Sequence, residues 1–156
     1  MKIKAQIRCI GRLPETWQRE AIHMYATRCS AFGAFEVLEY KEGHDKSTKP
    51  DIEKTTQKEA AELLKNLPSD ALVIALDEQG KQLASTEFSK LLSLNSDKQI
   101  VFLIGGSWGL HQSVLDRANV KLSLGKMTLP HALARIILLE QIYRGLMIER
   151  GSEYHK

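Results

Sequence analysis

Three glycines that directly follow an apolar run are the residues of this sequence best suited to binding a ligand. The run of residues 99–104, QIVFLI, ends in Gly105-Gly106, and Gly109 follows three residues later. A backbone without a Cβ atom can turn at positive φ and can let a flat ligand approach its amides. The spacing G-G-x-x-G is neither G-x-G-x-x-G nor a lysine-containing phosphate loop, which disfavours dinucleotide and nucleoside triphosphate binding. The alternative to a ligand site is a tight turn.

Two more segments have the same position relative to an apolar run. Residues 76–81 come at the end of the run ALVIALD (71–77) and directly after it, and residues 125–131 follow the run of residues 120–124. In open α/β folds, ligands bind outside the carboxyl ends of the strands. If the three runs are neighbouring strands, the three segments therefore meet in one binding site.

The elements that must position these segments alternate along the whole chain. Period-two patterns and short apolar runs predict strands, and apolar residues at three- and four-residue spacing predict helices. The polar segment of residues 41–50 is expected to be a loop that faces a substrate. We predict an α/β fold with a parallel sheet and helices on both faces, in one domain of residues 1–156. Its strands are expected at 3–10, 35–40, 71–77, 99–104 and 120–124, and its helices at 14–32, 51–67, 85–94, 111–117 and 131–149.

Composition sets limits on the class of protein. The chain of 156 residues is 43% hydrophobic and 26% charged, which is ordinary for one globular domain. Its formal net charge of +3 is too small to indicate nucleic acid by itself. No apolar run approaches the roughly 20 residues that span a bilayer, and Met1 leads directly into the first predicted strand. We therefore expect a cytoplasmic protein that does not contact membranes.

Neither the cysteines nor the histidines form a recognisable ligand cluster. Cys9 and Cys29 are far from any C-x-x-C pattern, so both are expected to be small core residues. The spacing of His23, His44 and His111 does not resemble that of metal ligands. We expect no metal site.

The last predicted helix is apolar around more than one face. Such a helix must be buried on several sides. Packing on the sheet covers one side, so we expect a second subunit to cover another, giving a homodimer; the alternative is that other parts of the same chain cover it. Arg135 and Arg144 interrupt the apolar surface, either to bind phosphate or carboxylate groups or to form ordinary ion pairs. The apolar residues are Leu133, Ile136, Ile137, Leu138, Leu139, Ile142, Leu146, Met147 and Ile148.

Three segments in this order resemble the RlmH family of SPOUT methyltransferases: LIGGSWGL at 103–110, SLGKMTLPHALAR at 123–135 and EQIYRGLMIERGSEYHK at 140–156. The resemblance covers essentially the whole chain. It implies an α/β domain with a trefoil knot in its C-terminal part, assembled as a homodimer. It also implies that S-adenosylmethionine is used to methylate N3 of a pseudouridine in the 23S rRNA of the assembled 70S ribosome.

The resemblance also implies which residues form the site. A sulfonium-bound methyl carbon is already electrophilic, so positioning should dominate catalysis, but the N3 proton must still leave. Candidates for the base or for a group that stabilises the developing anion are His131, Arg135, Tyr154 and His155. The cofactor is expected to bind to Leu76, Gly105, Leu124, Gly125, Lys126, Met127, Thr128 and Leu129.

RNA must be bound without a separate RNA-binding appendage, so recognition by shape is more plausible than base-by-base reading. Trp108 is a candidate stacking platform, although a smaller or polar residue is expected there in the family. Two rival classes are a non-catalytic ribosome-binding module and a flavodoxin-like enzyme that acts on a small molecule; DNA is not an expected partner. Candidate phosphate contacts are Arg8, Arg12, Arg19, Arg28, Arg135 and Arg144.

Overall fold

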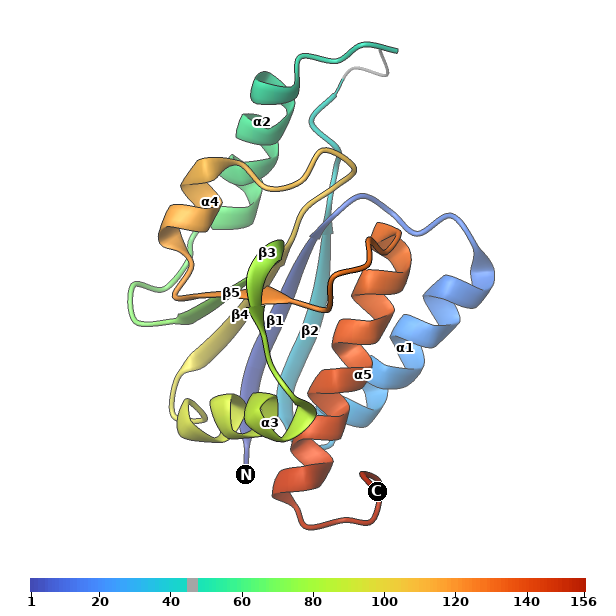
Figure 1. Cartoon of the computed structure of the whole chain (residues 1–156), viewed down its shortest axis with the longest axis vertical. Coiled ribbons are helices and arrows are strands. Elements are labelled where there is room, and N and C mark those ends of the chain that lie inside the picture. The colour runs from blue at the N-terminus through green and yellow to red at the C-terminus, as the bar shows by residue number, and fades with distance from the viewer. Residues whose placement is uncertain (45–47) are drawn as a thin grey trace.

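Strands and helices alternate along the chain in the computed structural model, which describes residues 1–44 and 48–156 (Figure 1). Residues 45–47, within the expected polar loop, lie outside the described residues. The strands are β1 (Ile3–Ile10), β2 (Gly33–Tyr40), β3 (Leu72–Gln82), β4 (Gln99–Ile104) and β5 (Val120–Ser123). The helices are α1 (Thr16–Ser30), α2 (Ile52–Leu64), α3 (Ser85–Leu94), α4 (Gln112–Arg117) and α5 (His131–Glu149).

All five strands pair in parallel in one sheet of order β2-β1-β4-β3-β5. The central strand β1 pairs Ala5 with Phe35 on one side and with Ile100 on the other. Because every strand runs the same way, the carboxyl ends of all five lie along one edge of the sheet. The predicted α/β fold is confirmed.

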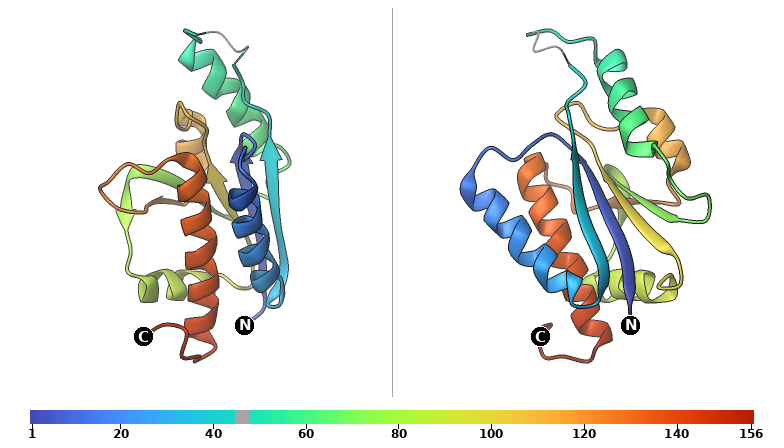
Figure 2. Two further views of the ribbon diagram at one scale, coloured as in Figure 1. Left: turned by 90° about the vertical axis from the view of Figure 1, so that its right-hand side faces the viewer. Right: turned by 180° about the vertical axis from the view of Figure 1, so that it is seen from behind.

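Helices cover both faces of the sheet and form two cores with it (Figure 2). Helices α1, α3 and α5 pack on one face, and α2 and α4 pack on the other. Side chains of β4 alternate between the cores: Ile100 and Phe102 point to the first, and Val101 and Leu103 point to the second. Each fully buried apolar side chain of this size contributes about 1.5–3 kcal/mol. Burial on both faces explains why the strands are almost continuously apolar.

Both cysteines belong to the first core. Cys9 and Cys29 are free thiols with 0% exposure. Burial raises the pKa of each thiol to about 12, so neither forms a thiolate near neutral pH. The prediction that they are core residues is confirmed.

Strand β3 is longer than the apolar run predicted, because it continues beyond a bulge. Its register with β5 shifts, so that Leu76 and Lys81 both pair with Leu122 and residues 77–80 leave the ladder. Gly80 permits this bulge to pack against β5, since a Cβ atom there would lie 2.6 Å from the Lys121 carbonyl carbon. The bulge lies at the carboxyl edge of the sheet.

Two of the candidate phosphate contacts are buried inside the chain, so the expectation that they meet RNA is wrong. Arg8 is 5% exposed and donates from Nη1 to the carbonyls of Leu63 (2.9 Å) and Lys65 (2.7 Å). Arg135 is 1% exposed and contacts other parts of its own chain, as described below. A buried guanidinium needs such acceptors, and the chain supplies them.

Among the described residues, no helix combines the length and the apolar character needed to cross a membrane.

Candidate active site

A cavity of about 150 Å³ lies at the carboxyl edge of the sheet, where β3, β4 and β5 end and α5 begins. It brings together the three segments that follow the apolar runs. Six of the eight predicted cofactor residues line it: Leu76, Gly105, Leu124, Gly125, Met127 and Leu129. Thr128 lines an adjoining open cleft of about 550 Å³, whereas Lys126 lines neither cavity.

The glycines after β4 form a tight turn that also forms a wall of the cavity. Gly109 donates its N–H to the Gly106 carbonyl (3.2 Å) and has φ +79°, a conformation that favours glycine. A Cβ atom on Gly105 would lie 2.8 Å from the Gly109 carbonyl oxygen. The tight turn that the sequence left as one alternative is therefore present and borders the cavity, and the ligand site stays a prediction.

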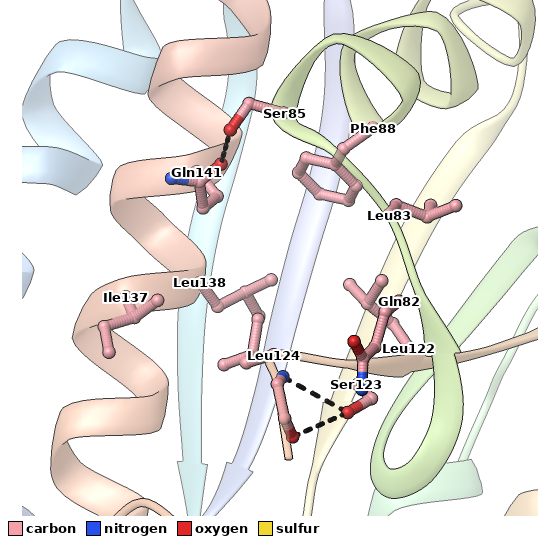
Figure 3. A pocket seen from close by; sticks show the side chains of 11 residues that line it. Gln82, Leu83, Ser85, Phe88, Leu122, Ser123, Leu124, Ile137, Leu138 and Gln141 are labelled. Atoms are coloured by element: carbon pink, nitrogen blue, oxygen red, sulfur yellow. Dashed lines mark hydrogen bonds between the residues drawn. The ribbon is translucent and has the colours of Figure 1, made fainter. Parts of the chain in front are cut away.

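The segment after β5 separates the first cavity from a second one. Ser123 Oγ accepts from the Gly125 N–H (3.2 Å) and donates to the Gly125 carbonyl (3.0 Å), which holds the turn (Figure 3). On the other side of this turn lies a cavity of about 280 Å³ between β3, α3 and α5, where Ser85 Oγ donates to Gln141 Oε1 (2.6 Å). Leu122, Leu124 and Gly125 line both cavities. Movement of this segment would therefore change the shape of both cavities.

Two of the predicted catalytic residues lie at the start of α5. His131 is the first residue of the helix and lines both the 150 Å³ cavity and the adjoining cleft. Arg135 lies one turn further on and points away from solvent. It donates to Glu39 Oε2 (2.6 Å) and to the carbonyls of Ile10 (3.2 Å) and Gly11 (3.1 Å). Arg135 thus joins the start of α5 to the carboxyl ends of β1 and β2.

The other two predicted catalytic residues, in the C-terminal tail, pack along the same helix. Tyr154 donates its hydroxyl to Glu140 Oε1 (3.1 Å), and its ring meets Tyr143 edge-on with centroids 5.0 Å apart. The Arg144 guanidinium lies 4.8 Å from the Tyr154 ring centroid and donates to His155 Nδ1 (3.2 Å). The tail is therefore held by specific contacts.

Burial raises the pKa of the Tyr154 phenol, and the hydrogen bond to the Glu140 carboxylate raises it further. The phenol is consequently protonated at neutral pH and acts as a hydrogen-bond donor there. It is poorly suited to be the base.

One chain does not bring all four predicted catalytic residues together. Tyr154 bonds to Glu140, nine residues along α5 from His131, which is about 13 Å along the helix axis. His155 lies beside Arg144, four residues further on, or about 20 Å from His131. The tail and the 150 Å³ cavity are therefore separate within a single subunit.

The structure adds acidic residues that the sequence reasoning did not assign. Asp77 and Glu78, in the β3 bulge, line the 150 Å³ cavity and the adjoining cleft. Their position directly after an apolar strand is the signal that could have identified them. Across residues 1–44 and 48–156, no group of three His, Cys, Asp or Glu side chains is placed to hold a metal ion.

Glu59 of α2 is a further residue that the sequence reasoning missed. It is 3% exposed; its Oε1 accepts from the Gly43 N–H (3.2 Å), and its Oε2 is one of two buried side-chain atoms without a hydrogen-bond partner among the described residues. A Cβ atom on Gly106 would lie 3.6 Å from this Oε2. Burial raises the pKa of Glu59, and the nearby Glu42 carboxylate raises it further. A glutamate on an amphipathic helix gives no local sign of such burial.

The fold and this cavity define a class: open α/β proteins that bind a ligand at the carboxyl ends of parallel strands. The model of the family described as "Predicted SPOUT methyltransferase" matches residues 1–155, and the chain belongs to this family. The resemblance that the sequence motifs indicated is confirmed.

Relatives of high similarity carry the name ribosomal RNA large subunit methyltransferase H. The protein of that name from Streptococcus equi subsp. zooepidemicus is 44% identical over 161 aligned positions, covering 100% of both chains. The one from Carboxydothermus hydrogenoformans is 41% identical over 152 positions, covering 94% of this chain and 96% of the relative.

The fold is also found among solved structures. A crystal structure titled probable rRNA-methyltransferase, from Porphyromonas gingivalis, matches with a TM-score of 0.60 and 15% sequence identity. The match covers 96% of this chain and 70% of that one. At this identity the likeness supports the fold alone.

Proposed function

We propose that this protein transfers a methyl group from S-adenosylmethionine to N3 of a pseudouridine in the 23S rRNA of the assembled 70S ribosome. The observation that carries the proposal is the cavity at the carboxyl edge, lined by six of the residues that the family implies for the cofactor. Membership of the SPOUT methyltransferase family supports the reaction, and the names of the relatives support the rRNA substrate.

The residues of the cavity suit this cofactor. Leu76, Leu124 and Leu129 offer apolar side chains to an adenine ring, and the glycine turn offers backbone amides to its edge. Met127 is 83% exposed, so its side chain is free to pack against a bound nucleoside. When bound, the cofactor supplies an electrophilic methyl carbon on a sulfonium.

The chain has then to hold N3 in line with that carbon at roughly 3–3.5 Å and to accept its proton. His131 borders the cavity and is a candidate base, as is His155 if a second subunit brings it there. Tyr154, with its raised pKa, would donate a hydrogen bond to the developing anion. Arg135 would act as a positioning residue, since its guanidinium braces the start of α5.

A homodimer would complete the site. Leu133 remains 38% exposed on α5, and Ile136 and Ile137 are only partly covered. We propose that α5 packs antiparallel against its copy about a twofold axis near Ile136 and Ile137. Because the tail lies about 13–20 Å from His131, an axis halfway between them sets the tail of one subunit beside His131 of the partner subunit.

The chain would act as a single cytoplasmic domain of residues 1–156. Its docking on the ribosome would rely on the shape of the rRNA. Arg12, Arg19 and Arg28 are exposed and could meet phosphates. Trp108, 43% exposed on the glycine turn, could stack on a base. The trefoil knot that the family implies stays a prediction.

The test is transfer of a labelled methyl group from S-adenosylmethionine to 70S ribosomes that lack the modification, followed by mass spectrometry of the labelled nucleotide. A methyl group on N3 of one pseudouridine is the expected result. Cofactor binding without transfer would contradict the substrate. Failure to bind the cofactor would favour a non-catalytic ribosome-binding module, and a yellow flavin that copurifies would favour a flavodoxin-like enzyme.

A further inference from the structure

We propose that Asp77 and Glu78 make the cofactor cavity selective for the positively charged S-adenosylmethionine over S-adenosylhomocysteine, whose sulfur is neutral. This inference rests on the proposed function, because it concerns the same cavity. It adds a specificity-determining role for two residues and a physical reason why the spent cofactor would leave.

The β3 bulge places the two carboxylates at the cavity. Residues 77–80 leave the ladder between Leu76 and Lys81, so their side chains are not set by pairing with β5. Asp77 Oδ1 accepts from the Gln79 N–H (3.2 Å), which stabilises the turn of the bulge. Gly80 allows the close approach to Lys121 that the bulge needs. The bulge thus places residues 77 and 78 in the cavity lining, and the Asp77 carboxylate also bonds to the backbone of the bulge.

The charge of the cavity lining is negative. Besides Asp77 and Glu78, His131 is the one titratable side chain among the described lining residues, and no lysine or arginine belongs to that lining. Lys81 ends the bulge and Lys126 lies in the β5–α5 loop, but neither lines the cavity. Two carboxylates without a neighbouring cation in the lining favour a ligand with positive charge.

The two cofactor forms are a matched pair for testing this. S-adenosylmethionine and S-adenosylhomocysteine share the 5′-deoxyadenosyl group, the α-ammonium and the α-carboxylate, and they differ by one methyl group and one positive charge on sulfur. A carboxylate about 6 Å from that charge, at the effective dielectric constant of about 20 found near protein surfaces, favours the cation by tenfold or more before salt screening. The change in the ratio of the two dissociation constants when the carboxylates are removed therefore measures their effect on the sulfur charge.

The experiment is calorimetric titration of the full chain with S-adenosylmethionine, S-adenosylhomocysteine and adenosine. We compare the unmodified protein with Asp77→Asn, Glu78→Gln and the double variant. The asparagine keeps an oxygen that can accept from the Gln79 N–H. Asp97→Asn is the matched control, because it removes the same charge from an exposed position before the start of β4, at the opposite edge of the sheet.

The expected result is that the preference for S-adenosylmethionine falls by about tenfold in the double variant and by less in each single variant. Adenosine has no sulfur, so its affinity should change much less than the preference does, and its binding also shows that the variants are folded. Asp97→Asn should keep the preference of the unmodified protein. Raising the salt concentration should reduce the preference in the unmodified protein but not in the double variant.

An unchanged preference in a double variant that still binds adenosine would overturn the inference and leave the proposed function intact. If the unmodified protein binds neither sulfur-containing compound, the proposed function fails, and the inference fails with it. The two failures are therefore distinguishable in one set of titrations.

Discussion

Glu59 shows at the scale of one residue how a charged group can be buried beside a binding site. Its carboxylate is nearly inaccessible, has one unpartnered oxygen and lies against Gly106 of the glycine turn. Because the pKa of Glu59 is raised in the folded protein, its protonated form is favoured there, and folding loses stability as the pH rises through that raised value.

We predict that Glu59→Gln stabilises the protein at pH 8, since the amide can still accept from the Gly43 N–H without the cost of a buried charge. The unfolding midpoint should rise by about 2–4 °C, the shift that about 1 kcal/mol produces in a chain of this size. The gain should shrink as the pH falls and vanish below about pH 4.5, where glutamate is protonated in the unfolded chain as well. Thermal unfolding of both proteins between pH 8 and about pH 4.5 measures this gain in stability. Glu62→Gln, an exposed change on the same helix, is the control, and equal effects of the two would refute the prediction.

Gly105 gives a second prediction at this scale. A Cβ atom there would clash with the Gly109 carbonyl, so Gly105→Ala must shift the turn that forms a wall of the cavity. We expect S-adenosylmethionine affinity to fall by about tenfold, equivalent to about 1.4 kcal/mol, and more for Gly105→Trp. Calorimetry measures this. Ser107→Ala, in the same turn but exposed, should bind normally; unchanged affinity in Gly105→Ala would show that the cofactor site is elsewhere.

At the scale of elements, the C-terminal tail and α5 act as one unit. The tail is attached through the Tyr154 hydroxyl and ring and through His155, all on the Glu140 and Arg144 side of the helix. An isolated aromatic or cation–π contact contributes about 0.5–2 kcal/mol. The tail is therefore ordered by contacts too weak to be essential for folding.

Deleting residues 154–156 should consequently depress methyl transfer far more than stability. We expect a loss of about 100-fold or more in kcat, as for removal of a group that moves a proton, with an unfolding midpoint lowered by only a few degrees. Single-turnover transfer assays and thermal unfolding measure the two effects. Tyr154→Phe keeps the ring contact with Tyr143 and loses the bond to Glu140, so it separates the hydroxyl from the packing. Full activity after the deletion would rule out a role for the tail in catalysis.

At the scale of the whole molecule, the distance between the tail and the cofactor cavity makes the assembly testable. If each site combines the cavity of one subunit with the tail of the other, two inactive variants can restore each other. Gly105→Trp has a tail but a blocked cavity, and the deletion of residues 154–156 has a cavity but no tail. A mixed dimer contains one complete site, and its other site has neither an open cavity nor a tail.

We predict that mixing the two variants restores methyl transfer, to about half the wild-type rate for each mixed dimer. Transfer is measured after the subunits have exchanged, and the proportion of mixed dimers is measured by native mass spectrometry. Each variant taken alone through the same exchange step is the control. Mixed dimers that form without activity would place the tail in the site of its own subunit.

The sequence by itself determined the order and type of the elements and the family. Strand and helix periodicity is local, so runs such as residues 99–104 and the glycines after them could be read without the structure. The three segments after the apolar runs were correctly expected to meet, because parallel strands end at one edge.

Only the tertiary structure decided which charged groups are buried and which residues share a cavity. Arg135 is bonded to Glu39, 96 positions away, and to Ile10, 125 positions away, and neither acceptor can be inferred from the residues near it in sequence. The same holds for Glu59 beside Gly106 and for the tail beside Glu140. Periodicity reports which face of an element is apolar, but partners of single polar atoms depend on how distant elements pack, and that is a property of the folded chain alone.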